Sequence, residues 1–345
     1  MRALIDKLNE NETLSFEEFC KLISDYSESD KEYAASLARD ISKKHFENKI
    51  YIRGLIEISS YCKNDCLYCG LRKSNKNAER YRLTKEQIME CCKSGYNLGF
   101  RTFVLQGGED MCYTDEIVVD IVSDIRKNYP DCAITLSLGE KSRESYKKFY
   151  DAGANRYLLR HETADCEHYS KLHPQNLTLQ NRMECLKNLK EIGYQTGCGF
   201  MVGAPYQTPE TIAKDLLFIS EFKPEMVGIG PFVPHKDTPF KEYNHGSLEL
   251  TLFLLSLVRI MLKKVLLPST TALGTIHPDG RQLGILSGAN VVMPNLSPSD
   301  VREKYLLYDN KICTGDEAAE SLKSLKNTMF SIGYEIIQSR GDYEV

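Results

Sequence analysis

The sequence predicts an α/β protein: a complete (β/α)8 TIM-type barrel with N-terminal helices and a C-terminal helical extension. Short apolar strand-like segments alternate with helix-like segments until eight strand candidates are counted. This alternation is typical of a parallel sheet covered by helices. Eight units within about 250 residues fit a closed barrel better than an open sheet. Polar turns rich in cysteine or glycine follow the first four strands, where a barrel carries its chemistry.

The elements are expected in the following order. Residues 1–48 look helical, and Ser15–Glu18 has the pattern of a capping box. The strands are expected at residues 50–59, 101–106, 133–138, 155–160, 195–202, 226–230, 266–271 and 289–293. Intervening helices are expected at residues 84–98, 115–128, 142–151, 178–192, 208–222 and 248–264. The tail looks helical at 318–331, which gives three parts: a helical extension (1–48), the barrel (49–308) and a helical cap (309–345).

Composition excludes several classes of protein. With 345 residues, 42% hydrophobic and 27% charged, the chain is typical of a globular protein. Its net charge of −4 argues against binding nucleic acid, which favours a basic face. No apolar stretch approaches the roughly 18 residues of a membrane span. Twelve cysteines behind a charged N-terminus without a signal peptide indicate a reducing compartment, and we expect a cytoplasmic protein.

A cysteine-rich loop after the first barrel strand is the most informative feature. Cys62, Cys66 and Cys69 form a C-x3-C-x2-C pattern. A four-iron cluster normally takes four thiolates, so three leave one iron open to an outside ligand. Structural zinc needs four ligands, and the nearest histidines, His45 and His161, are distant in sequence. A disulfide would leave one of the three cysteines without a partner.

With this loop and the following turns, the chain resembles the radical-SAM (S-adenosylmethionine) superfamily. Within it, the chain resembles the HydE family of [FeFe]-hydrogenase maturation enzymes over nearly its whole length. The segments that carry the resemblance are residues 66–72, 104–110, 135–140, 156–163, 226–232, 234–239, 270–276 and 288–295. So many matches in order are more specific than the cysteine pattern, which assigns only the superfamily.

The resemblance implies one [4Fe–4S] cluster, held by the three cysteines and completed by SAM. It implies that the turn Gly107–Glu109 binds the amino group of SAM, Glu162 its ribose and Arg182 its methionine carboxylate. An arginine fork suits a carboxylate because it donates two parallel hydrogen bonds. Without the resemblance, these residues would be an ordinary turn and two helix-end charges. The residues expected around SAM are Tyr68, Gly107, Gly108, Glu109, Ser137, Glu162, Arg182 and Tyr305.

A second group of residues is expected to bind substrate. Thr135, Arg156, Thr270 and Thr271 match family positions that bind a small anion or carboxylate inside the barrel. Arg156 and Arg160 are four residues apart and therefore share one side of a regular strand. From the residues alone, Arg156 could equally be exposed at the start of its strand, and the threonines could be ordinary strand residues.

The resemblance implies reductive cleavage of SAM and action on a small cysteine-derived iron–carbonyl–cyanide substrate during hydrogenase assembly. Its expected partners are other maturation proteins and an electron donor such as ferredoxin or flavodoxin. Two alternatives remain: a 3-methylornithine synthase-like mutase and, from another class, a non-catalytic iron–sulfur carrier. Some relatives hold an auxiliary cluster on three late cysteines. Here Cys313 has no partner cysteines in residues 314–324, so a single cluster is expected.

Overall fold

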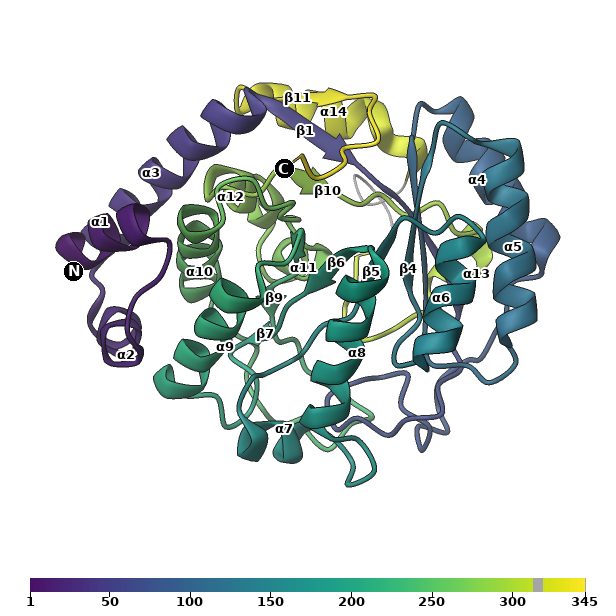
Figure 1. Ribbon diagram of the computed structural model, residues 1–345, viewed down its shortest axis with the longest axis horizontal. Coiled ribbons are helices and arrows are strands. Elements are labelled where there is room, and N and C mark those ends of the chain that lie inside the picture. The colour runs from purple at the N-terminus through teal and green to yellow at the C-terminus, as the bar shows by residue number, and fades with distance from the viewer. Residues whose placement is uncertain (313–318, 345) are drawn as a thin grey trace.

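The computed structural model describes residues 1–312 and 319–344, and a parallel barrel lies at its centre (Figure 1). Six strands form its main sheet in the order β2-β3-β4-β5-β6-β8. They are β2 (Gly54–Ser59), β3 (Thr102–Gly107), β4 (Ala133–Ser137), β5 (Arg156–Leu158), β6 (Gln195–Cys198) and β8 (Met226–Val227). A further short pair, β7 (Met201–Val202) and β9 (Gly230–Pro231), extends the wall after β6 and β8.

Three parallel bridges close the sheet into a ring. They join β8 to a segment at 266–268, that segment to β10 (Val291–Val292), and the residues after β10 back to β2. The bridges are Met226–Leu266, Pro268–Val291 and Leu55–Asn295. The extended segments near residues 266 and 291 supply the seventh and eighth strand positions of the ring, so the predicted barrel is confirmed.

Helices lie on the outside of the ring. They are α4 (Lys85–Asn97), α5 (Asp115–Asn128), α6 (Arg143–Asp151), α7 (Cys166–Leu172), α8 (Leu179–Ile192), α9 (Pro209–Phe222), α10 (Leu248–Met261), α11 (Thr271–Ile276), α12 (Gly280–Leu286) and α13 (Ser299–Arg302). Thr84, Thr178 and Thr208 cap α4, α8 and α9 by accepting a hydrogen bond from a first-turn N–H. The short helices α7, α11, α12 and α13 were not predicted. Helix α11 also shortens the strand expected at 266–271.

Alternation along the strands decides which side chains face the barrel interior. On β4, Ile134 and Leu136 pack in the main hydrophobic core. Thr135 and Ser137 therefore lie on the opposite, inward face. On β2, Ile56 and Ile58 belong to the same core, so Glu57 faces inward. The interior is consequently polar toward the carboxyl ends of the strands.

Both ends of the chain pack against the barrel. Helices α1 (Arg2–Asn11), α2 (Phe16–Asp25) and α3 (Glu28–Phe46) lie against α9 and α10 on one flank (Figure 1). Strand β1 (Lys49–Ile52) continues into β2 and pairs with β10 and with β11 (Glu335–Ile337). The C-terminal part also contains the short 3-10 turn η2 (Ala319–Ser321) and α14 (Leu322–Ser331). No helix among the described residues is long and apolar enough to cross a membrane.

Candidate active site

The cysteine loop packs against the turn that follows β3. Lys63 donates its N–H to the carbonyl of Glu109 (2.9 Å), and Gly108 donates to Ser59 (3.1 Å). A Cβ on Gly108 would lie 2.2 Å from the carbonyl oxygen of Tyr61. Only glycine permits this approach, so the glycine-rich turn is matched to the backbone of the cysteine loop.

The three loop thiols lie close to one another. Burial raises the pKa of Cys66, and the thiols of Cys69 and Cys62 raise it further. Burial and then Cys62 raise the pKa of Cys69 to about 12. All three cysteines are free thiols. Among the described residues, no three Cys, His, Asp or Glu side chains converge on a single ion. Three free thiols in one loop are one fewer than a four-iron cluster normally takes, so they fit a cluster with one iron open to another ligand.

Glu109 connects two loops at the barrel mouth. Its Oε1 accepts the N–H of Glu140 (3.0 Å), and its Oε2 lies 3.1 Å from Nζ of Lys63. Gly139 has a φ of 75°, and a Cβ there would lie 2.1 Å from Cγ of Glu109. The side chain of Glu109 is thus built into the framework, and its backbone forms the turn beside the cysteines.

Arg182, in the first turn of α8, reaches across to the loops after β4 and β5. Its Nε donates to Oε1 of Glu140 (2.5 Å), and its Nη1 donates to the carbonyl of Arg160 (2.6 Å). The side chains of Arg182 and Glu140 are only 8% and 9% exposed. The structure therefore brings the guanidinium of Arg182 to the barrel mouth in a fixed orientation.

Glu162 is held in a conformation that a glutamate rarely adopts. Its φ is 65°, and its N–H donates to the carbonyl of Gly199 (3.0 Å). Its Oε2 lies 3.1 Å from Nη2 of Arg160. That oxygen, together with Nε and Nη2 of Arg160, is buried without a hydrogen-bond partner in the described part of the chain. The two side chains thus form an ion pair that leaves hydrogen-bonding capacity at Oε2 of Glu162 and at Nε of Arg160, and a ligand could use it.

A buried histidine–aspartate pair forms hydrogen bonds to the backbone around Glu162. Nδ1 of His161 accepts the N–H of Gly199 (3.2 Å), so its single proton is on Nε2, 3.3 Å from Oδ1 of Asp215. Asp215 also accepts the N–H of Ala164 (2.5 Å). Burial lowers the pKa of His161 to about 3 and raises that of Asp215. His161 is therefore a neutral residue that fixes the backbone around Glu162.

Two tyrosines lie near the cysteine loop. Tyr68 shares a hydrogen bond with Nε2 of His173 (3.2 Å), and their rings meet edge to face. Tyr305 is buried, and its hydroxyl accepts from Gln106 (3.4 Å). Burial and then Glu57 raise the pKa of Tyr305, with further contributions from the thiols of Cys69 and Cys62. Tyr305 therefore lies near the cysteines, and Tyr68 is itself part of the cysteine loop.

The His173 imidazole gives a pH prediction. Burial lowers its pKa to about 3, from 6.5. Below pH 6.5 the unfolded chain takes up a proton that the folded protein excludes, so stability falls with decreasing pH. At pH 5 we expect this group alone to cost about 2 kcal/mol. In urea unfolding at pH 7 and pH 5, His173→Gln should show a correspondingly smaller loss than the wild type. An equal loss would contradict the prediction.

The predicted substrate residues divide between the interior wall and the floor of the barrel. Thr135 faces inward from β4, and Thr270 lies just before α11; the hydroxyl oxygens of both are buried without a hydrogen-bond partner in the described residues. Thr271 begins α11 beside Thr270. Arg160 was not among the predicted site residues. The sequence signal that could have indicated a site role for Arg160 is its spacing of four residues from Arg156.

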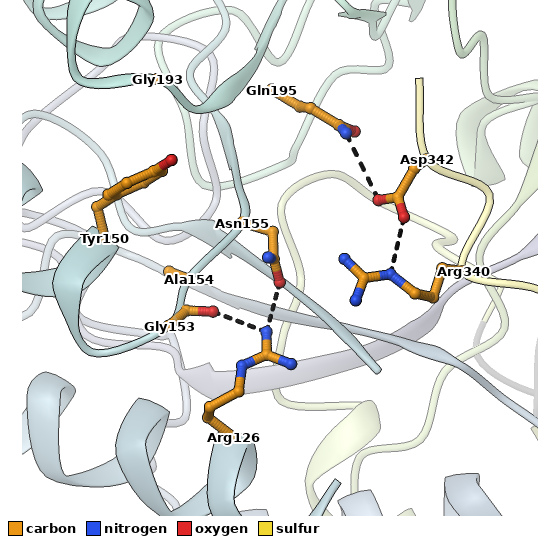
Figure 2. Close-up of a pocket in the computed structure, with 9 residues that line it drawn as sticks. All are labelled: Arg126, Tyr150, Gly153, Ala154, Asn155, Gly193, Gln195, Arg340 and Asp342. Carbon is orange, nitrogen blue, oxygen red and sulfur yellow. Dashed lines mark hydrogen bonds and ion pairs between the residues drawn. The ribbon is translucent and has the colours of Figure 1, made fainter. Parts of the chain in front are cut away.

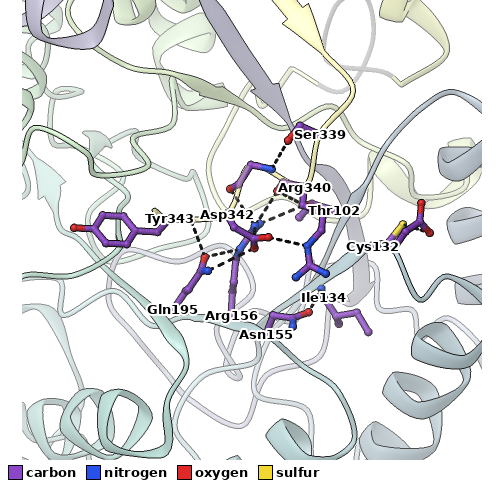
Figure 3. A network of polar contacts seen from close by, with 12 residues as sticks. Thr102, Cys132, Ile134, Asn155, Arg156, Gln195, Ser339, Arg340, Asp342 and Tyr343 are labelled. Atoms are coloured by element: carbon purple, nitrogen blue, oxygen red, sulfur yellow. Dashed lines mark hydrogen bonds and ion pairs between the residues drawn. The ribbon is translucent and has the colours of Figure 1, made fainter. Parts of the chain in front are cut away.

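Arg156 lies at the amino end of β5, away from the cysteine loop, where the C-terminal tail crosses the barrel (Figure 3). It is fully buried and donates to Oδ1 of Asp342 (2.6 Å) and to the carbonyls of Arg340 (2.8 Å) and Gly341 (3.0 Å). Gln195 and Thr102 accept its remaining hydrogen bonds. Because all three nitrogens of this guanidinium already have partners within the protein, the structure does not support the predicted substrate role of Arg156.

A cavity of about 530 Å³ opens beside this floor network (Figure 2). Arg126 lines it and donates to the carbonyl of Gly153 (2.8 Å) and to Oδ1 of Asn155 (2.5 Å). Arg340 is paired with Asp342 (2.7 Å). The charges around the cavity are thus satisfied within the protein, and we assign it no part in the active site.

Comparison with known proteins identifies the family. A sequence model of the radical SAM superfamily matches residues 56–219. The chain is 49% identical over 277 residues, covering 80% of its own length and 79% of the relative, to the [FeFe] hydrogenase maturase subunit HydE of Thermotoga maritima. The chain belongs to the radical SAM superfamily. The predicted superfamily and enzyme class are confirmed, and the protein is a radical SAM enzyme homologous to HydE.

Other radical SAM proteins share the fold. The 3-methylornithine synthase of Methanosarcina acetivorans is 30% identical over 96% of this chain and 92% of its own. The crystal structure of methylornithine synthase (PylB) superposes with a TM-score of 0.84 at 29% identity, covering 97% of each chain. The structure of HydG, a maturase of the [FeFe]-hydrogenase, superposes with a TM-score of 0.81 at 20% identity, covering 97% of this chain and 75% of that one. The likeness to HydG establishes the fold alone.

Proposed function

We propose that Cys62, Cys66 and Cys69 hold a single [4Fe–4S] cluster and that the protein cleaves SAM reductively at the open iron. When bound, such a cluster supplies the electron that splits SAM into methionine and a 5′-deoxyadenosyl radical. The observation that supports this best is the group of three mutually close free thiols at the barrel mouth. The prediction that Cys313 holds no second cluster lies outside the described residues.

The residues around the thiols fit SAM. The Gly107–Glu109 turn lies against the cysteine loop, where its carbonyls can receive the amino group of SAM. Glu162 offers a buried carboxylate oxygen for the ribose. Arg182 is oriented by Glu140 for the methionine carboxylate. Tyr68, Ser137 and Tyr305 complete the proposed SAM site.

Glu162 gives a direct test of this site. Glu162→Gln should weaken SAM binding about tenfold, because it replaces a charged acceptor of the ribose hydroxyls with a neutral one. Calorimetry on the reconstituted, anaerobic enzyme measures the dissociation constant. The matched control is Glu167→Gln on α7, a largely exposed residue paired with Lys171. Equal dissociation constants for Glu162→Gln and the wild type would reject this role for Glu162.

We further propose a small cysteine-derived iron–carbonyl–cyanide substrate, as expected of a HydE homologue. A carboxylate or another anionic group of this substrate would bind Arg160, whose Nε lacks a hydrogen-bond partner among the described residues and whose Nη2 lies 3.1 Å from Oε2 of Glu162. Thr135, Thr270 and Thr271 would bind polar groups on the adjoining wall. The closed barrel would exclude water from the reaction. The proposed setting is the cytoplasm, with other maturation proteins and a ferredoxin or flavodoxin as electron donor.

Two alternative functions, a 3-methylornithine synthase and an iron–sulfur carrier, can be distinguished from the proposed one by experiment. A 3-methylornithine synthase activity is supported by the 30% identity and the TM-score of 0.84. An iron–sulfur carrier would need neither Glu162 nor Arg182 directed at SAM. Calorimetry with SAM distinguishes a carrier from an enzyme, because a carrier should show no binding of SAM.

The deciding experiment is anaerobic reconstitution with SAM, a reductant and each candidate substrate, followed by analysis of 5′-deoxyadenosine and products. We expect 5′-deoxyadenosine to form, and the cysteine-derived iron substrate to be consumed with it. Abundant 5′-deoxyadenosine formed only with lysine would overturn the maturase proposal in favour of the mutase.

A further inference from the structure

The segment 305–311, which we call the mouth segment, bridges loops on different sides of the barrel mouth. The carbonyl of Leu307 accepts the N–H of Gly70, at the end of the cysteine loop (2.8 Å). Asp309 donates its N–H to Pro234 (3.0 Å), in the loop after β9, and its Oδ2 accepts the N–H of Lys236 (2.7 Å). The mouth segment therefore joins the cysteine loop to the loop after β9.

The contact with the cysteine loop is close. A Cβ on Gly70 would lie 2.2 Å from the carbonyl oxygen of Leu306 and 2.4 Å from Cδ2 of His235. Tyr305, the first residue of the mouth segment, is buried with its hydroxyl at Gln106 of β3. A shift of the mouth segment would consequently move Tyr305 and the end of the cysteine loop together.

The last residue of the mouth segment, Lys311, inserts its side chain into the barrel. Its Nζ forms an ion pair with Oε1 of Glu57 on the inward face of β2. The two side chains are only 6% and 1% exposed. Nζ also donates to the carbonyl of Tyr305 (3.0 Å) and lies 4.9 Å from the centre of its ring.

Glu57 is itself rigidly held. Its Oε2 accepts from Nδ2 of Asn295 (2.8 Å), and its N–H donates to Oγ of Ser297 (2.8 Å). Its carbonyl accepts the hydroxyl of Tyr81 (2.8 Å). A fixed, buried carboxylate is a strong anchor, because loss of either ion-pair partner leaves an uncompensated charge in the interior.

We infer that Lys311 is a positioning residue of the radical SAM reaction. Through Glu57 it fastens the mouth segment over the barrel, and so holds Tyr305 against the cysteine loop above the proposed SAM site. The effect on SAM binding rests on the proposed function. The attachment of the mouth segment to the barrel depends only on the ion pair between Lys311 and Glu57. A surface salt bridge could not do this, since exposed pairs contribute little.

The test compares Lys311→Met with the wild type and with Lys304→Met in the reconstituted holoenzyme. Lys304 forms an ion pair with Glu79 (2.8 Å) at the surface immediately before the mouth segment, which makes it a matched control. Amide hydrogen exchange is measured without SAM, and SAM affinity by calorimetry. For Lys311→Met we expect exchange in residues 305–311 to accelerate at least about tenfold and SAM affinity to fall about tenfold. Lys304→Met should change neither.

Two further variants separate positioning from a general loss of stability. Lys311→Arg keeps the charge and should restore most of the SAM affinity. Glu57→Gln, which is isosteric, should reproduce the faster exchange, and the double variant should add little to either single one. The inference is overturned if Lys311→Met exchanges residues 305–311 at the wild-type rate, or if it exchanges them faster but binds SAM with wild-type affinity. If the wild type binds no SAM, the proposed function fails, and the exchange comparison still decides whether Lys311 closes the mouth.

Discussion

Replacing Cys69 with alanine should reduce SAM cleavage to the background rate. Two thiolates cannot hold a four-iron cluster in the three-point arrangement that leaves one iron open. Iron content should fall in parallel, and the same outcome is expected for Cys62→Ala and Cys66→Ala. The measurement is 5′-deoxyadenosine formed from SAM with excess reductant after anaerobic reconstitution.

Cys166→Ala is the control for this experiment. Cys166 is an exposed free thiol at the start of α7, outside the C-x3-C-x2-C loop. Its loss should leave iron content and SAM cleavage at wild-type values. Wild-type cleavage by Cys69→Ala would show that the loop is not the cluster site, and equal loss in Cys166→Ala would show that the effect is not specific to the loop.

Arg156→Met should destabilise the fold by about 3 kcal/mol without changing SAM affinity. The substitution breaks a buried ion pair and leaves the carbonyls of Arg340 and Gly341 without their donor. Because these groups lie at the barrel floor, the SAM site should be unaffected. Urea unfolding of the anaerobic protein measures the stability, and calorimetry measures the SAM affinity.

Two other arginines complete this comparison. Arg143 on α6 is half-exposed and pairs with Glu191 (2.7 Å), so Arg143→Met should cost less than about 1 kcal/mol. Arg160→Gln removes the ion-pair partner of Glu162 and should abolish turnover of the substrate. If Arg156→Met instead abolished substrate turnover in a protein of normal stability, the substrate-binding role that the sequence predicts for Arg156 would be correct.

The barrel could be predicted from the sequence because its signals are local. Apolar strands and polar residues that cap the following helix recur in several units, and each unit lies next to its neighbour. The seventh strand of the barrel shows where prediction from local sequence signals is less accurate. A strand was expected through residue 271, but only single bridges hold residues 266–268, and Thr271 already starts a helix. Local strand propensity could not reveal that helix start.

The two interior arginines show the limit for the site. The spacing predicts one shared side of a regular strand for Arg156 and Arg160, but β5 ends at Leu158 and Arg160 lies in the turn beyond it, beside Glu162. It could not reveal that Arg156 meets Asp342, which is 186 residues away in sequence. The Glu57–Lys311 pair spans 254 residues and was equally invisible. Long-range ion pairs have no periodic signal, so they required the structure.

The central claim is that three thiolates leave one iron open for SAM. It is tested most directly by electron–nuclear double resonance on the reduced, reconstituted protein, with SAM labelled with ¹⁵N in its amino group and ¹⁷O in its carboxylate. Our account predicts magnetic coupling of both labelled groups to the cluster. A reduced cluster that shows coupling to neither label would contradict it.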